Sequence, residues 1–203
     1  MDYFKGLNVD QVAGIDEAGR GPLAGPVVAA AVILSPDRPI EGLNDSKKLS
    51  EKRRDFLFDI IMEQAHAVGI GQCSHLEIDR LNILQATMVA MQRAYNELGC
   101  SAKKVFVDGN RTPQLPVESE AIIKGDQKLA CISASSIIAK VTRDRQMLLF
   151  SKKYPEYHFN QHKGYGTKLH IECLYAYGPS PIHRRSFSPV RQAASSCVTD
   201  SVE

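Results

Sequence analysis

Residues 14–26 are Gly14-Ile15-Asp16-Glu17-Ala18-Gly19-Arg20-Gly21-Pro22-Leu23-Ala24-Gly25-Pro26, and the rest of the chain can be interpreted outward from them. Two adjacent acids follow an apolar lead-in, and an arginine then stands between two glycines. Adjacent carboxylates beside an apolar core are uncommon unless a cation meets them. The glycines allow close approach of a ligand to the backbone, and an arginine fork suits phosphate. The stretch therefore indicates metal and phosphate binding, and a tight turn with a solvated Asp-Glu pair remains the alternative.

An apolar run follows this stretch, from Val27 to Leu34. The run is typical of a strand buried on both faces, and residues 11–18 are expected to form the strand before it. The connection at residues 19–25 is longer and richer in glycine and proline than a hairpin requires. Because long structured loops often carry function, we expect this loop to belong to the site.

Strands and helices are expected to alternate through the middle of the chain. Three further strands are predicted at residues 67–73, 104–109 and 120–125. Helices are predicted after Ser50, a candidate N-cap, after the capping box from Ser74 to Glu77, and after Asp126. The helix after the capping box is expected to run to Leu98. This alternation predicts an α/β fold with helices flanking a sheet.

The composition of the chain limits its class. The net charge of the 203 residues is only +2, so any basic face must be local. The first residues lack a secretory signal, and the longest apolar run is too short to span a bilayer. Five scattered cysteines without a Cys-x-x-Cys pair favour free thiols in a reducing compartment. We expect a cytoplasmic monomer with no membrane association.

Residues 151–191 differ from the preceding part. Lysines and arginines far outnumber acids there, and tyrosines and phenylalanines are interleaved with them. Such mixtures neutralise phosphates and offer rings for sugars and bases, although a solvated helical face over an aromatic core is the alternative. Residues 192–203 are polar and unpatterned, and we expect them to form a disordered tail.

Three of the predicted strands end in acids, which are Asp16 with Glu17, Asp108, and Asp126. Taken singly, Asp108 can belong to a turn and Asp126 can be a helix N-cap. In an α/β sheet, however, like ends of neighbouring strands converge in one crevice. Converging carboxylates repel each other unless a divalent cation lies between them, and oxygen-only ligands suit Mg²⁺ or Mn²⁺. Two such ions can activate a water and stabilise the departing oxygen of a phosphodiester.

An ordered set of motifs resembles the ribonuclease HII family. The motifs are residues 14–26, Asp45-Ser46-Lys47-Lys48-Leu49, Val107-Asp108-Gly109-Asn110, Lys124-Gly125-Asp126, residues 132–141, His162-Lys163-Gly164-Tyr165-Gly166-Thr167 and His183-Arg184-Arg185-Ser186-Phe187. They cover the chain from Val12 to Phe187, and Ser135 is one departure, where alanine is expected in many relatives. The resemblance implies an RNase H-like mixed sheet with flanking helices as a catalytic domain at residues 1–150. It also implies a small C-terminal helical part, residues 151–191, packed on that domain.

The resemblance further implies an endoribonuclease that cuts the RNA strand of RNA–DNA hybrids and the 5′ side of single ribonucleotides embedded in duplex DNA. The implied products carry 3′-hydroxyl and 5′-phosphate ends, and the implied roles are RNA primer removal and ribonucleotide excision repair. The implied cofactors are two Mn²⁺ or Mg²⁺ ions. The implied catalytic and metal-binding acids are Asp16, Glu17, Asp108 and Asp126.

The resemblance also assigns contacts with nucleic acid. Gly19, Arg20 and Gly21 are implied to sense the ribose 2′-hydroxyl and hold the adjacent phosphate, and Tyr165 is implied to pack on the next deoxyribose. Because only a 2′-hydroxyl distinguishes the target, backbone amides close to the sugar suit this task. Further candidate contacts are Lys47, Ser133, Ser136, Lys163 and Arg184. For several residues the alternatives are solvation or packing, and for Lys140, Arg143 and Arg145 a solvated helix face is weighed against a DNA contact.

Three other interpretations remain open from sequence. Ribonuclease HIII shares the fold, but its members carry a long N-terminal domain, whereas the first acid here is residue 16. An integrase-like or resolvase-like nuclease would cut DNA, but such enzymes need no sensor of the 2′-hydroxyl like the Gly-Arg-Gly loop. A nucleic-acid-binding module without activity has no reason to keep four mutually repelling carboxylates together.

Overall fold

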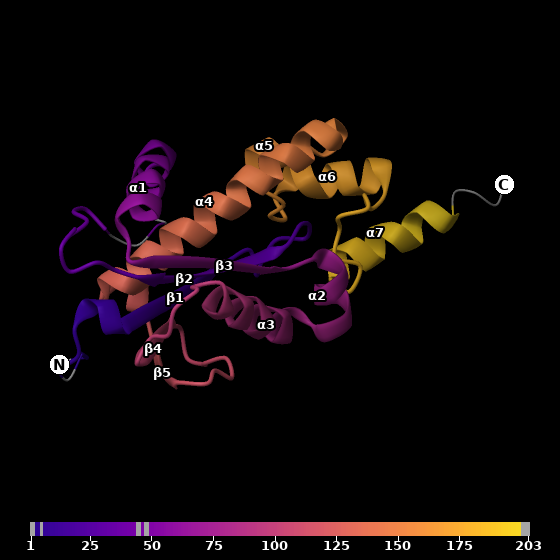
Figure 1. Ribbon diagram of the computed structural model, residues 1–203. Helices are drawn as coiled ribbons and strands as arrows, with labels where there is room; N and C mark the ends of the chain where they lie inside the picture. Colours follow the sequence, from indigo (N-terminus) through magenta and orange to yellow (C-terminus); the bar gives the residue numbers. More distant parts are fainter. Residues whose placement is uncertain (1–2, 5, 44–45, 47–48, 200–203) are drawn as a thin grey trace.

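A mixed sheet forms the centre of the molecule in a computed structural model, which describes residues 3–4, 6–43, 46 and 49–199, with no side chains described after residue 195 (Figure 1). Its strands are β1 (Val12–Ala18), β2 (Val27–Ile33), β3 (Ala67–Cys73), β4 (Lys104–Asp108) and β5 (Glu118–Ile122). Their order is β3-β2-β1-β4-β5. The first three strands are antiparallel neighbours, whereas β4 runs parallel to β1 and β5 parallel to β4. The predicted α/β fold with a mixed sheet is confirmed.

Helices cover both faces of this sheet. They are α1 (Glu51–Gln64), α2 (His75–Leu81), α3 (Ile83–Asn96), α4 (Ala130–Lys153), α5 (Phe159–His162), α6 (Lys168–Tyr177) and α7 (Ser188–Thr199). Helices α1 and α4 lie on one face and α3 on the other, while α5, α6 and α7 gather near the far end of α4 (Figure 1). Short 3-10 turns occupy Val9–Gln11, Gly125–Gln127 and Pro155–Tyr157.

Strand β2 is buried on both faces, as its apolar sequence predicts, and all seven of its residues are inaccessible to solvent. Ala29 and Ala31 pack in the core under α3, whereas Ala30 and Val32 pack in the core under α1 and α4. Each buried valine or isoleucine contributes about 1.5–3 kcal/mol relative to exposure. The strand therefore supplies a rigid partner for β1, which carries two of the candidate acids.

Gly14 brings helix α4 close to the acids of β1. A Cβ atom at this position would collide with the backbone of Cys131 and Ile132 in the first turn of α4. Only a residue without a side chain allows this approach. The start of α4 is therefore held against the strand that carries Asp16.

Two segments differ from the sequence prediction near the site. The helix expected to run from the capping box to Leu98 is divided at Asn82, which has φ 67° and accepts a hydrogen bond from the Gln85 amide at 3.1 Å as the N-cap of α3. Strand β5 ends at Ile122, and Asp126 follows on a 3-10 turn after left-handed Lys124. Asp126 therefore neither ends a strand nor caps α4, whose N-cap is Leu129.

The expectation of a disordered tail from residue 192 is wrong for residues 192–199, because α7 continues to Thr199. Val190 and Ala193 are fully buried on Leu23 and Leu174, three residues apart on one face of the helix. The polar composition of this segment does not indicate a helix, because among its described side chains only two small apolar residues at helical spacing dock it on the rest of the protein. Residues 200–203 lie outside the described residues.

Candidate active site

Three candidate acids come from neighbouring parallel strands. Ile15 of β1 pairs with Val107 of β4, so the next residue on each strand is an acid, Asp16 and Asp108. Asp16 and Glu17 are adjacent, and the Glu17 amide donates to Asp16 Oδ1 at 2.7 Å. Convergence of these acids is what the ends of adjacent strands predict, although Asp16 and Glu17 lie within β1 and not beyond its end.

Asp126 is attached to the same region through the backbone. The amide of Gly125 donates to Asp108 Oδ1 at 2.7 Å, which ties the 3-10 turn carrying Asp126 to the end of β4. Asp126 is buried, and it shares a cavity with Ser133 and Leu43 at the start of α4. The structure therefore places the turn that carries Asp126 next to Asp108. Asp126 itself lines a different cavity from the one lined by Asp16 and Glu17.

The electrostatics of Asp16 indicate that a cation is needed. Burial raises the pKa of Asp16 well above its usual range, and the negative charges of Glu17 and then Asp108 raise it further. The Ser136 side chain and the Glu17 amide oppose this shift only in part. The ammonium group of Lys140, which lines the cavity, is already paired with Asp144 at 2.7 Å.

These residues fit a divalent metal ion, because three oxygen-donor side chains repel each other and Mg²⁺ or Mn²⁺ prefers such donors. Within the described ranges, however, no group of three or more His, Cys, Asp or Glu side chains is close enough to enclose an ion. Asp16, Glu17 and Asp108 interact electrostatically without forming a closed cage. Ion binding would therefore draw their oxygens together.

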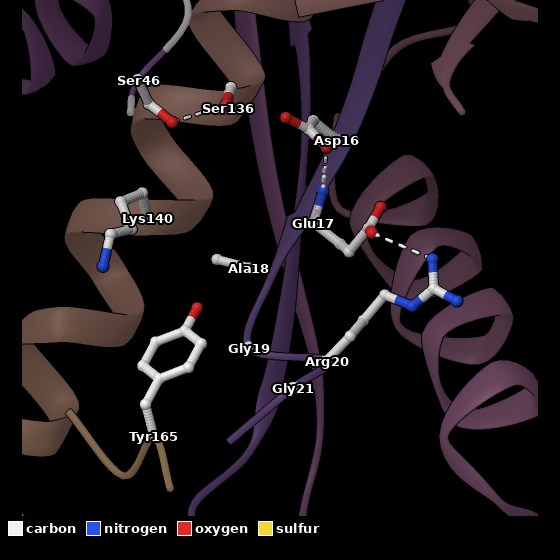
Figure 2. A pocket seen from close by; sticks show the side chains of 10 residues that line it. All are labelled: Asp16, Glu17, Ala18, Gly19, Arg20, Gly21, Ser46, Ser136, Lys140 and Tyr165. Carbon is white, nitrogen blue, oxygen red and sulfur yellow. Dashed lines mark hydrogen bonds and ion pairs between the residues drawn. The ribbon is translucent and has the colours of Figure 1, made fainter. Parts of the chain in front are cut away.

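A cavity of about 290 Å³ adjoins the acids. Figure 2 shows Asp16 directed toward Ser136 of α4, whereas Glu17 is directed toward Arg20 on the opposite side. The Arg20 guanidinium lies 3.4 Å from Glu17 Oε1 and is half-exposed. The cavity is lined by Asp16, Glu17, Ala18, Gly19, Arg20, Gly21, Ser46, Ser136, Lys140 and Tyr165. The structure thus brings the Gly-Arg-Gly loop, the first two acids and Tyr165 to one cavity.

Two buried arginines shape the Gly-Arg-Gly loop. Arg184 donates to four backbone carbonyls, those of Gly19 at 2.6 Å, Arg20 at 2.9 Å, Gly25 at 3.0 Å and Pro26 at 3.1 Å. Arg143 donates to the carbonyls of Pro26, Lys163 and Ala24 at 3.0, 3.0 and 3.1 Å. Burial, and secondarily the charge of Arg143, lowers the pKa of Arg184 to about 9, so both guanidiniums stay protonated at neutral pH.

This arrangement orients the amides of the loop. In a trans peptide the carbonyl of one residue and the N–H of the next point in opposite directions. The carbonyls of Gly19 and Arg20 point at Arg184, so the N–H groups of Arg20 and Gly21 point away from it. Because both residues line the cavity, these two adjacent amides are candidate donors to a ligand there.

The prediction that Arg184 contacts nucleic acid directly is therefore wrong, because its side chain is 0% exposed and its nitrogens donate to carbonyls of the loop. Arg143 is also neither a solvated residue nor a DNA contact, because it is 1% exposed. The sequence does contain a signal that Arg143 is buried. It stands four residues after Ala139 and four before Met147, both buried, so it falls on the apolar stripe of α4.

The remaining predicted contacts are placed differently. Tyr165 is 43% exposed and stands at the cavity wall, and Ser136 lies at the other end of the same wall, beyond Lys140 (Figure 2). Lys163 is directed at its own turn, because its Nζ donates to the Asn160 carbonyl at 2.6 Å. Ser133 lies in the cavity of Asp126, and its buried hydroxyl has no hydrogen-bond partner among the described residues. Lys47 lies outside the described residues.

The two glycines of the loop are expected to respond differently to alanine. Gly19 has φ 97°, and a Cβ there would collide with the Arg143 side chain, so Gly19→Ala should destabilise the fold by about 2–4 kcal/mol. A Cβ at Gly21 would meet only the Tyr165 ring, at 3.7 Å. Gly21→Ala should therefore fold normally but lose activity, because the methyl group enters the cavity. Urea unfolding and cleavage assays on both variants check this pair, and equal loss of stability would contradict it.

Three buried histidines lie behind Tyr165. Burial is the largest cause that lowers the pKa of His170 to about 4 and that of His183 to about 3, with neighbouring histidines as a further cause. Burial also lowers the pKa of His162. All three are therefore neutral in the folded protein at physiological pH.

This neutrality predicts a pH-dependent stability. An unfolded histidine gains a proton as the pH falls below about 6.5, whereas folded His183 gains none until about 3, so stability is lost as the pH falls. As the pH falls from 7 to 5, the protonation of unfolded His183 should lower the free energy of unfolding by about 2 kcal/mol. Urea unfolding should show a weaker pH dependence for His183→Gln than for wild type. The exposed His66→Gln control should retain the wild-type dependence.

The family model described as Ribonuclease HII matches residues 13–190 of this sequence. The chain belongs to the ribonuclease HII family. Ribonuclease HII 1 of Methylibium petroleiphilum is 59% identical over 190 residues, which are 94% of this chain and 96% of the relative. The crystal structure of ribonuclease H2 from Pyrococcus horikoshii OT3 is similar with a TM-score of 0.75 and 30% identity, covering 91% of this chain and 97% of that one.

This member of the ribonuclease HII family is accordingly a metal-dependent endoribonuclease that cleaves RNA strands in RNA–DNA hybrids. The crystal structure of Bst-RNase HIII in complex with Mn²⁺ has a TM-score of 0.70 at 16% identity, which is a likeness of fold alone. The family assignment therefore replaces the ribonuclease HIII and DNA-nuclease alternatives. None of the helices in the described ranges is long and apolar enough to cross a membrane.

Proposed function

We propose that this ribonuclease HII cuts duplex DNA on the 5′ side of a single embedded ribonucleotide, leaving 3′-hydroxyl and 5′-phosphate ends. The observation that supports this proposal is the hold of Arg184 on the Gly19 and Arg20 carbonyls, which turns the next two amides away from Arg184 in a loop that lines the cavity beside the candidate acids. An embedded ribonucleotide differs from its neighbours only by a 2′-hydroxyl. Rigid amides at the sugar detect that hydroxyl without reading the base.

The proposed metal ligands are Asp16, Glu17, Asp108 and Asp126. Two Mn²⁺ or Mg²⁺ ions held by these acids would activate the attacking water and stabilise the departing 3′ oxygen. The elevated pKa of Asp16 supports this assignment, because a buried carboxylate surrounded by like charges needs a cation to remain ionised. Ion binding by the free protein should therefore release protons and weaken as the pH falls.

The duplex is held by residues around the same cavity. The half-exposed Arg20 guanidinium binds the phosphate beside the ribonucleotide, and the hydroxyl of Ser136 at the cavity wall assists it. The exposed Tyr165 ring packs on the deoxyribose after the ribonucleotide and so recognises the RNA-to-DNA step. In the cell these properties suit removal of RNA primers and of ribonucleotides misplaced in DNA.

The test uses a labelled DNA duplex with one ribonucleotide, incubated with Mg²⁺, Mn²⁺ or chelator beside an all-DNA duplex and a long RNA–DNA hybrid. We expect a metal-dependent cut on the 5′ side of the ribonucleotide and an intact all-DNA control. Cleavage of the long hybrid alone would refute the role of the loop and Tyr165 in recognising single ribonucleotides. Binding without cleavage of either substrate would indicate an inactive module.

A further inference from the structure

We propose that His170 and His183 are positioning residues for Tyr165, acting through a hydrogen-bond relay that runs in one direction from Ser180 to the Tyr165 backbone carbonyl. The inference rests on the proposed function, because it assumes that Tyr165 contacts the substrate. It concerns residues that the acids, the loop and the metal ions do not use. Its basis is the set of contacts around three buried imidazoles.

The relay is continuous and closed to solvent. The Ser180 amide lies 2.9 Å from His183 Nδ1, and the Ser180 hydroxyl lies 2.7 Å from the same atom. His183 Nε2 lies 2.9 Å from His170 Nε2. His170 Nδ1 then lies 2.9 Å from the carbonyl oxygen of Tyr165. His170 and His183 are 0% and 1% exposed, so no water competes for these bonds.

The end groups of the relay fix every proton in it. A backbone amide can only donate, so His183 Nδ1 is an acceptor and its proton lies on Nε2. A carbonyl can only accept, so His170 carries its proton on Nδ1 and accepts at Nε2. The two assignments agree at the central contact, where the N–H of His183 donates to His170. A second proton on either ring would place two N–H groups against each other.

The same contacts exclude a metal site at these two imidazoles. Each ring has one lone pair, and each lone pair already accepts a hydrogen bond from a buried donor. Binding an ion would therefore require breaking the relay. We therefore interpret the two imidazoles as structural links in the hydrogen-bond relay.

His162 extends the support on the other side of the loop. Its Nδ1 accepts from the Gly164 amide at 3.2 Å, so its proton lies on Nε2, which donates to the Tyr157 carbonyl at 2.9 Å. Its ring stacks on His170 with centroids 4.4 Å apart. Neutral imidazoles thus hold the backbone both before and after Lys163, whose own φ is 52°.

The relay acts on the orientation of the Tyr165 ring. The Tyr165 amide donates to the His162 carbonyl at 2.9 Å, and its carbonyl also accepts from the Thr167 amide at 2.8 Å. The ring itself is exposed, the Arg143 guanidinium lies 5.9 Å from its centroid, and a Cβ atom added at Gly21 would lie 3.7 Å from its Cε1 atom. Because the ring is 43% exposed, the fixed backbone contributes to where it points.

The test compares two amide side chains that place their nitrogen at different positions of the imidazole ring. The nitrogen of asparagine takes the place of Nδ1, whereas the nitrogen of glutamine takes the place of Nε2. His170→Asn can therefore donate to the Tyr165 carbonyl, and His170→Gln cannot. The readout is the ratio of cleavage rates on the single-ribonucleotide duplex and on the long hybrid, measured in wild type, both variants, Tyr165→Ala and the double variant Tyr165→Ala with His170→Gln.

We expect Tyr165→Ala and His170→Gln each to lower this ratio by about ten- to a hundredfold, because small misplacement of a substrate contact has effects of that size. His170→Asn should lower the ratio less than His170→Gln, because asparagine keeps the donor to the Tyr165 carbonyl and loses only the acceptor for His183. His170→Gln should have no further effect once Tyr165 is removed. A full additional loss in the double variant would overturn the relay, as would equal ratios for the two His170 variants. No change in Tyr165→Ala would instead refute the role of Tyr165 in the proposed function, and with it the positioning role.

A second measurement tests the relay without activity. Long-range ¹H–¹⁵N spectra of the wild-type protein should show the proton of His170 on Nδ1 and those of His162 and His183 on Nε2. The opposite tautomer at His170 would overturn the inference whatever the cleavage data show. Thermal unfolding of each variant confirms that the rates are compared between folded proteins.

Discussion

Asp16→Asn should lower the rate of cleavage by at least about 10³-fold and leave binding to an RNA–DNA hybrid intact. The amide cannot supply the charge that holds a divalent ion, and metal-dependent charge stabilisation accounts for several kcal/mol of the barrier. In the proposed function, hybrid binding depends on the loop, Tyr165 and basic residues, none of which changes. Single-turnover cleavage and fluorescence anisotropy with a labelled hybrid measure the two properties separately.

The same substitution is expected to stabilise the metal-free protein. Burial and the charges of Glu17 and Asp108 make ionised Asp16 unfavourable, and a neutral asparagine of the same shape removes this cost. Its oxygen can still accept from the Glu17 amide. The exposed Asp55→Asn variant, which loses only a surface pair with Arg145, is the matched control and should keep full cleavage. Substantial cleavage by Asp16→Asn would refute the assigned mechanism.

Arg184→Lys should destabilise the protein by about 3–5 kcal/mol and reduce cleavage strongly. One ammonium group cannot reach the four carbonyls that the guanidinium fork satisfies, and buried carbonyls without partners are costly. The released carbonyls of Gly19 and Arg20 also allow the loop amides to turn away from the cavity. Urea unfolding measures the first effect, and cleavage of the single-ribonucleotide duplex measures the second.

The neighbouring Arg185 provides a matched control. Its side chain is exposed, and it is the backbone amide, not the guanidinium, that donates to Asp79 at 2.9 Å. Arg185→Lys should therefore change the unfolding free energy by less than about 0.5 kcal/mol. Equal stability of the Arg184 and Arg185 variants would show that the loop does not depend on the buried fork.

Local patterns in the sequence predict most of the fold. The apolar run of β2 and the capping residue Ser50 depend on nearest neighbours along the chain, and both predictions are confirmed. The break at Asn82 was missed because the apolar spacing continues across it, and only its positive φ reveals two helices. Asp126 was assigned to the end of a strand because apolar residues precede it, whereas the backbone turns at Lys124 first.

The site was predicted less evenly. The proximity of the acids of β1 and β4 follows from the sequence, because adjacent parallel strands bring like positions together, and Ile15 pairs with Val107 as that argument requires. The role of Arg184 was not found, because a cation has the same signature in sequence whether it faces water or buried carbonyls. Arg143 differs, because its place on the apolar stripe of α4 does indicate burial. His170 gave no signal, since its partners are backbone atoms and another histidine thirteen residues away.

The distance along the chain between Gly19 and Arg184 has a consequence for synthesis. Their hydrogen bond joins residues 165 positions apart, whereas β1 and β2 pair within the first part of the chain to leave the ribosome. Domains generally begin to fold from the N-terminal side during translation. A nascent chain can thus assemble the strand that carries Asp16 long before the guanidinium that shapes the loop exists. If the loop has the role proposed above, the part of the site that selects the substrate is completed only after the strand that carries Asp16.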